Sequence, residues 1–117
     1  MPGSDPLASI NLVFGADAQD VRDATVYLRL EEAGRVDAPS RIVAEQVLRG
    51  VAWEAGKPLH LELRGDVPPS SGSYQLRVHV DVDGDGQVSA GDYVSTESYP
   101  VNPSAGPAHL GVRVHRV

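Results

Sequence analysis

The chain has 117 residues, a formal net charge of −6 and no cysteine. The absence of cysteine excludes disulfides, thiol catalysis, cysteine-based zinc sites and a lipid-modified cysteine within these residues. Much of the acidity lies in residues 80–97, which contain no Lys or Arg, and no basic patch is visible elsewhere. This charge pattern argues against a nucleic-acid partner and favours attraction of cations to one segment.

The N-terminal stretch lacks the basic and apolar regions of a secretory signal peptide. We expect residues 1–7 to be disordered and the chain, residues 1–117, to form a single domain. No apolar run approaches the roughly 18 residues that a transmembrane helix needs. The compartment stays open, and the periplasm or the extracellular space is favoured if a leader has been removed.

Alternation of apolar and polar residues with a period of two is the dominant pattern of the chain. In residues 26–31, for example, Val26, Leu28 and Leu30 alternate with polar neighbours. Each such run has one apolar and one polar face, which is typical of antiparallel sheets that are wetted on one side. Turn-forming sequences separate the expected strands, which are, in chain order, residues 10–14, 26–31, 59–64, 74–82, 93–101 and 110–115.

Residues 40–53 allow two interpretations. A helix could be capped by Ser40 and ended by Gly50, because the apolar residues in between also fit a helical stripe. A strand over residues 41–49 is the alternative, and periodicity alone does not decide between the two.

The sequence "DAPSRIVAEQ", from Asp37 to Gln46, and the later "YPV", from Tyr99 to Val101, carry a family resemblance. Together with the strand patterns of about residues 8–116, they resemble the YbaY-like and YscW-like lipoprotein families, which include type III secretion pilotins. The resemblance implies a compact β-sandwich in which residues 41–48 form a strand. The chain departs from these families in lacking a lipobox cysteine and in carrying an acidic loop where they have a short hairpin.

With this strand included, the chain has about seven short strands separated by turns. We therefore predict an all-β fold, an antiparallel β-sandwich that is immunoglobulin- or transthyretin-like in general architecture. Such a domain fits a monomer, which is the oligomeric state that we expect.

The acidic loop "DVDGDGQVSAGD" matches the EF-hand calcium template, with Asp in place of Glu at the twelfth position. It also resembles the calcium loop of dockerin modules, which use Asp at that position. Gly86 occupies the sixth position, where the backbone must turn sharply. Ser89 could reach an ion through water, and Val88 is expected to point into the core. The predicted metal ligands are the side chains of Asp81, Asp83, Asp85 and Asp92 and the backbone carbonyl of Gln87.

Calcium (Ca2+) suits this loop because it takes six to eight oxygen ligands, while magnesium stays an alternative. Zinc is disfavoured because the loop contains neither His nor Cys. A bare acidic turn is the competing interpretation, since Asp-Gly pairs are also common in hairpins. A strand enters the loop and we expect a strand to leave it, so the loop lies at a hairpin tip. We therefore expect weak binding, with a Kd on the order of 10⁻⁴ to 10⁻³ M, rather than a helix-opening switch.

The four histidines, at positions 60, 79, 109 and 115, all fall on predicted polar faces, where we expect them to be solvated. His79 and His115 would form a surface metal site if their strands paired. Trp53 is expected in the core or at its edge. No sequence motif places a nucleophile beside a base, so we expect no enzymatic activity.

Two functional hypotheses follow from these patterns. The first is a non-enzymatic calcium-binding β-sandwich module with a role in the bacterial envelope or in protein interaction. The alternative is a pilotin-like peptide-binding or chaperone module, in which a sheet face or edge receives a peptide from an unidentified protein partner and the acidic loop is incidental. An uncharacterised hydrolase would instead need a cleft with a perturbed carboxylate pair.

Overall fold

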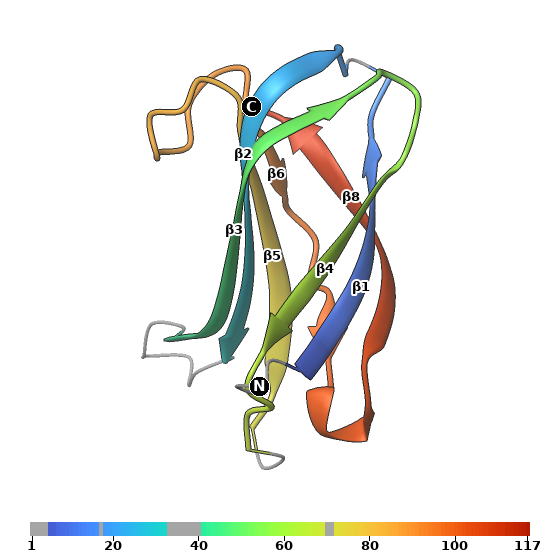
Figure 1. Ribbon diagram of the computed structural model, residues 1–117, viewed down its shortest axis with the longest axis vertical. Coiled ribbons are helices and arrows are strands. Elements are labelled where there is room, and N and C mark those ends of the chain that lie inside the picture. The colour runs from blue at the N-terminus through green and yellow to red at the C-terminus, as the bar shows by residue number, and fades with distance from the viewer. Residues whose placement is uncertain (1–4, 17, 33–40, 70–71) are drawn as a thin grey trace.

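Figure 1 presents the computed structural model of the chain, which describes residues 5–16, 18–32, 41–69 and 72–117. The sequence features at Asp37, Ala38, Pro39 and Ser40 lie outside these ranges. The elements are β1 (Asp5–Phe14), β2 (Val21–Glu32), β3 (Arg41–Trp53), β4 (Leu59–Gly65), β5 (Tyr74–Asp81), β6 (Tyr93–Ser95), β7 (Pro100–Val101), the 3₁₀ helix η1 (Pro103–Ala105) and β8 (Ala108–Arg116). The predicted all-β fold is therefore confirmed.

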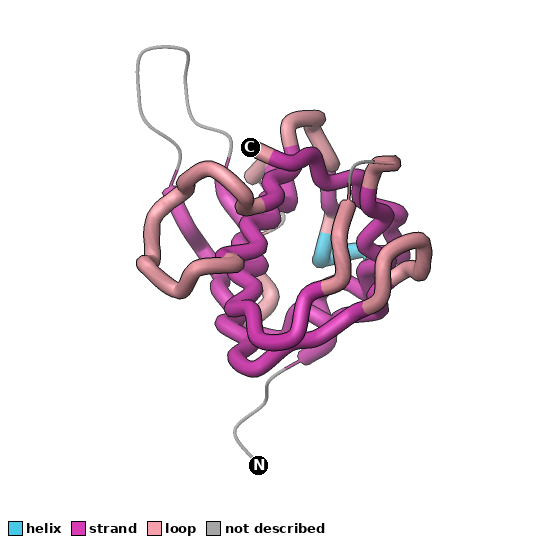
Figure 2. The backbone as a smooth tube through the Cα atoms, turned by 90° about the horizontal axis from the view of Figure 1, so that it is seen from above, coloured by secondary structure: helices cyan, strands magenta, loops and turns pink. Residues whose placement is uncertain are grey.

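The strands form one continuous sheet in the order β3-β2-β5-β6-β8-β1-β4, and β7 also pairs with β5. The sheet curls so that β3, β2 and β5 lie opposite β4, β1 and β8, with the short β6 joining the two halves (Figure 1). Seen from above, the strands surround a common interior (Figure 2). The architecture is thus a sandwich that is nearly closed into a barrel, with β3 and β4 as the two ends of the sheet.

The core consists of the apolar faces that the alternation predicts. In β2, Val26, Leu28 and Leu30 are fully buried, while Tyr27 and Arg29 between them are only partly buried. Each fully buried side chain of this size contributes roughly 1.5–3 kcal/mol relative to an exposed one. Trp53 lies in the core as expected, where its ring stacks on Phe14 with ring centroids 4.4 Å apart.

The prediction that residues 1–7 are disordered is wrong for residues 5–7, the part of that segment that the structure describes. β1 begins at Asp5, and Leu7 is buried in the core. Because Asp5 pairs with Gly65 of β4, the sheet includes the chain from Asp5 to the end of β1 at Phe14. One pairing also departs from the antiparallel prediction: residues 8–14 of β1 pair in parallel with residues 108–114 of β8.

Residues 41–53 form a strand, so the helical interpretation is wrong and the strand implied by the family resemblance is confirmed. The strand is longer than expected, because Gly50 does not end it. Arg49 and Gly50 together face a single residue of β2, and this β-bulge places Gly50 at φ 64°, a conformation that glycine adopts without strain.

The single strand predicted at residues 93–101 is divided into β6 and β7. Both segments pair with β5, since His79 faces Val94 and Gln75 faces Pro100. The register of β7 on β5 is shifted by two residues relative to that of β6. The two extra residues lie in an irregular loop between β6 and β7. After this loop the chain contacts β5 again at Tyr99, whose carbonyl accepts a hydrogen bond from the Leu76 N–H at 2.9 Å.

Candidate functional site

The acidic loop connects β5 to β6 and projects from one end of the molecule (Figure 1). The two strands pair antiparallel, with Val80 facing Tyr93, so the loop is a hairpin connection as predicted. Its last residues are also tied to the C-terminal end of the described chain: Gly91 N–H donates to the Val117 carbonyl, and Val117 N–H donates to the Asp92 carbonyl. The loop is therefore fixed to the sandwich on both sides.

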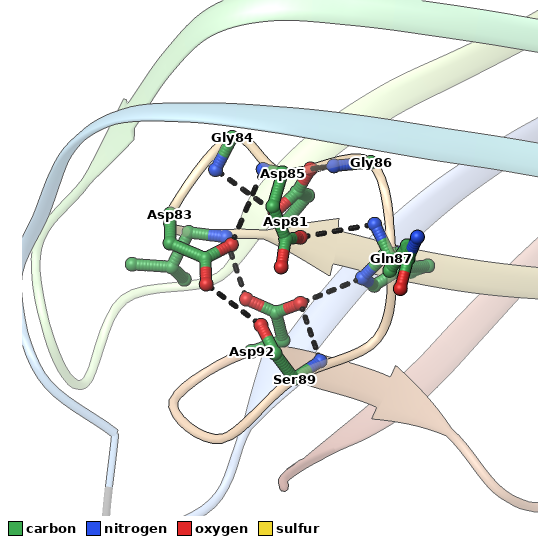
Figure 3. A network of polar contacts seen from close by, with 10 residues as sticks. Asp81, Asp83, Gly84, Asp85, Gly86, Gln87, Ser89 and Asp92 are labelled. Atoms are coloured by element: carbon green, nitrogen blue, oxygen red, sulfur yellow. Dashed lines mark hydrogen bonds and ion pairs between the residues drawn. The ribbon is translucent and has the colours of Figure 1, made fainter.

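Two carboxylates of the loop are buried. Asp81 is 1% exposed and Asp92 is fully buried. Asp81 accepts the N–H groups of Gly84 and Gly86 at 3.0 and 2.8 Å, and thereby folds the first half of the loop around itself (Figure 3). Gly86, at the predicted sharp turn, has φ 77°, which favours glycine.

Asp92 is the centre of a second set of hydrogen bonds. Its Oδ1 accepts the N–H of Val82 at 2.9 Å, and its Oδ2 accepts the N–H of Ser89 at 3.1 Å. The same Oδ2 lies 2.9 Å from Nε2 of His79. Asp92 thus holds together the beginning of the loop, its end and the adjacent strand β5.

Asp83 and Asp85 lie on the exposed side of the loop. Asp83 accepts a hydrogen bond from the Ser89 hydroxyl at 2.7 Å, and Asp85 accepts the Gln87 N–H at 2.9 Å. The Ser89 hydroxyl, followed by the interaction with Asp81, lowers the pKa of Asp83 from 3.8 to about 2. Asp83 therefore stays ionised well into the acidic range, as a cation ligand must.

The predicted carboxylate ligands come together. Asp81, Asp83, Asp85 and Asp92 each offer one oxygen, and these oxygens lie within 4.8 Å of one another. Figure 3 shows the carboxylates of Asp81, Asp83 and Asp92 turned toward one another. Calcium–oxygen distances of about 2.3–2.6 Å allow a single ion to contact oxygens at this mutual separation. The backbone N–H of Gln87 donates a hydrogen bond to Asp85, and Gln87 is exposed.

His79 was expected to be solvated, but it is 8% exposed. Its ring stacks on Tyr27, with centroids 5.4 Å apart, and contacts the buried Asp92. A donor atom of His79 also lies within 4.8 Å of carboxylate oxygens of Asp81 and Asp92, so this buried trio is a second possible donor set. The sequence feature that could have indicated this contact is that His79 lies two residues before Asp81, at the end of the same strand.

One further expectation about a side chain is wrong, and the condition for a metal site of His79 and His115 is not met. Val88 does not point into the core, since it is 57% exposed. His79 and His115 do not lie on paired strands, because β6 lies between β5 and β8. Among the described residues, the clusters of three or more potential metal ligands include neither His60, His109 nor His115.

No protein-family model matches the chain, and no curated protein matches it either. Among solved structures, the chain is similar to an alternative pilotin from the type II secretion system of Vibrio cholerae. The two share 18% sequence identity and superpose with a TM-score of 0.74, covering 98% of each chain. The similarity shows a pilotin-like fold, as the family resemblance implied. Membership of the YbaY-like or YscW-like families stays a prediction.

Proposed function

We propose that this chain is a non-enzymatic, pilotin-like module that binds a protein partner in the bacterial envelope. The observation that carries the proposal is the fold similarity to the alternative pilotin, which extends over 98% of both chains. The match therefore includes nearly the whole of both chains and is not restricted to a few strands. The proposed role implies that the protein works outside the cytoplasm.

The sheet offers two edges to which such a partner could add a strand. β3 and β4 are the ends of the strand order, and each pairs with only one neighbour among the described residues. An extended peptide binds such an edge through main-chain hydrogen bonds, while alternate side chains provide specificity. The edges therefore supply a physical mode of binding that needs no preformed cleft.

The cavity that Asp20 and Glu54 line lends no support to an enzymatic alternative. It has a volume of about 450 Å³. Asp20 accepts the Ala55 N–H at 2.6 Å, and Glu54 pairs with Lys57 at 3.0 Å. Since each carboxylate is engaged separately, they do not form the coupled acid pair that hydrolysis would use.

The test is a binding screen with overlapping peptides that cover the secretion-system proteins of the source organism, followed by amide NMR of the labelled chain. We expect one peptide family to shift resonances along β3 or β4 and to leave the β5–β6 loop unchanged. The control is the same peptide in scrambled order. If no peptide binds, or if the scrambled peptide binds equally, the protein-binding proposal fails.

A second function is favoured by the converging carboxylates of the β5–β6 loop. We propose that Asp81, Asp83, Asp85 and Asp92 hold a calcium ion, with the Gln87 carbonyl as a further ligand. The observation in support is that four carboxylate oxygens lie within 4.8 Å. Because strands rather than helices flank the loop, binding would stabilise the hairpin and would not open a helical groove.

A calcium titration of the chain, followed by amide NMR, tests this second function. We expect shifts confined to residues 81–92 and, for a Kd of 10⁻⁴ to 10⁻³ M, a stabilisation of about 1.4–2.7 kcal/mol at about 10 mM calcium. The variant Asp83→Asn with Asp85→Asn should lose the response and keep its fold, because both residues are exposed. Asp23→Asn with Asp66→Asn makes the same charge change outside the loop and should respond normally. Unchanged spectra in the unsubstituted chain would refute calcium binding.

A further inference from the structure

The outer edge of β3 is the longest unpaired strand edge that the structure describes. Natural edge strands are usually protected by Lys, Pro or charges that point inward. β3 has no Lys and no Pro, and two of its apolar side chains, Ile42 and Val47, are 49% and 36% exposed. β4 approaches β3 from the inner face, where the Arg64 N–H donates to Oε1 of Gln46 at 3.4 Å. No strand that the structure describes pairs with the outer edge itself.

The regular part of this edge is short and well defined. Residues 44–48 pair with residues 26–30 of β2 in unbroken register. Register shifts occur on both sides of this segment, at Val43 and at the bulge of Arg49 and Gly50. An added strand centred on Val47 can pair over roughly five residues, 45–49, of which 45–48 are regular and Arg49 is the first residue of the bulge, before the twist turns the edge away.

Glu45 and Arg49 give this segment a self-complementary charge pattern. Glu45 lies on the outer face, where its Oε2 accepts a bond from Nε of Arg29 at 2.6 Å, which leaves Oε1 available. Arg49 is exposed and forms no ion pair with another described residue. In antiparallel pairs, residues directly opposite each other share one face, so Glu45 of one copy can face Arg49 of another.

The charges also favour an axis through Val47 over one through Glu45. If a two-fold axis passed through Glu45, two Glu45 side chains would face each other, and Arg41 would face Arg49. If the axis passed through Val47, Glu45 would face Arg49 of the second copy, and the symmetry would repeat this pair. Val47 would then contact its own symmetry mate, which would cover one of the exposed apolar side chains.

We propose that the outer edge of β3 binds a second copy of this chain, in an antiparallel C2 pairing centred on Val47. The dimer would join the β5-β2-β3 halves of two copies into one continuous sheet. It would not involve β4, which is the other end of the strand order within each copy (Figure 1). This departs from the monomer expected from the sequence. It depends neither on calcium nor on the pilotin-like function, because it uses residues of β3 alone.

Disulfide trapping tests the register directly, because the chain has no cysteine of its own. On the axis, two copies of residue 47 would have Cα atoms about 4.5–5.5 Å apart, which suits a disulfide. Val47→Cys should therefore form a covalent dimer under mild oxidation. Ile42→Cys is the matched control: it lies on the same strand and is more exposed, but is roughly 33 Å from its symmetry mate. If Ile42→Cys cross-links as readily as Val47→Cys, or if neither does, the proposal is overturned.

Sedimentation equilibrium of the unsubstituted chain provides the second measurement. We expect reversible dimers, and we expect Arg49→Glu to raise the dimer Kd at least about tenfold, because Glu45 would then face Glu twice. The control is Arg113→Glu, which makes the same charge change at an exposed position of β8 and should leave the Kd unchanged. A chain that is monomeric at all concentrations, or a dimer insensitive to Arg49→Glu, would contradict the proposed pairing.

Discussion

Asp92 supports the β5–β6 loop even without a cation, and Asp92→Ala should therefore destabilise the chain in the presence of a chelator. The carboxylate is fully buried and accepts the N–H groups of Val82 and Ser89 at 2.9 and 3.1 Å. Its removal leaves these donors and His79 without their acceptor. Each unsatisfied buried donor costs about 1–3 kcal/mol, so we expect a loss of about 3–5 kcal/mol in the free energy of unfolding.

Urea unfolding followed by the fluorescence of Trp53 measures this loss, since Trp53 is the only tryptophan and is buried against Phe14. Asp85→Ala is the matched control: it removes a carboxylate of the same loop, but an exposed one with a single backbone donor, and should cost less than about 1 kcal/mol. If Asp92→Ala and Asp85→Ala shift the unfolding midpoint equally, Asp92 does not organise the loop and the reasoning is refuted.

Three further predictions concern the same loop and the core. The pKa of Asp83 is lowered from 3.8 to about 2 in the folded chain, so its contribution to stability is present above pH 3.8 and is lost as the pH falls through about 2. Ser89→Ala should raise this pKa toward its ordinary value, which carboxyl NMR titration measures; an unchanged pKa would exclude the hydroxyl as the main cause. Gly86→Ala should cost about 1–2 kcal/mol, because φ is 77° there and alanine is strained in that region, and urea unfolding that shows no loss would contradict the positive φ. Leu28→Ala should cost about 2–5 kcal/mol in the same assay, since Leu28 is fully buried, whereas a loss below 1 kcal/mol would place it outside the core.

Local alternation was enough to predict most of the fold. In β2 the residues that alternate in the sequence are those that alternate in burial, because a strand has a side-chain period of two. The sequence did not predict that β1 pairs in parallel with β8, since that pairing joins the two ends of the chain and leaves no local pattern. It also missed the interruption after Ser95, where the ladder with β5 shifts by two residues without any Gly or Pro to mark the bulge.

The candidate site could be predicted only in part. Template spacing identified the four aspartates whose carboxylate oxygens converge. The template assumes that Val88 anchors the loop in a core beside helices, but at a hairpin tip no core lies next to this position, and Val88 stays exposed. Periodicity assigned His79 to a solvated face. The loop folds back toward β5 instead, and the His79 ring becomes buried between Tyr27 and Asp92.

The four carboxylates of the loop divide into two pairs with different tasks, and this division separates the two interpretations of the acidic sequence. Asp81 and Asp92 are buried and accept backbone N–H groups, so their charges are compensated by the loop itself. Mutual repulsion among four acids is therefore a weaker argument for a cation than the sequence suggested. Asp83 and Asp85 lie on the exposed side, where a cation would add ligands that the turn does not require. Substitution of the exposed pair tests metal binding, whereas substitution of the buried pair tests the hairpin.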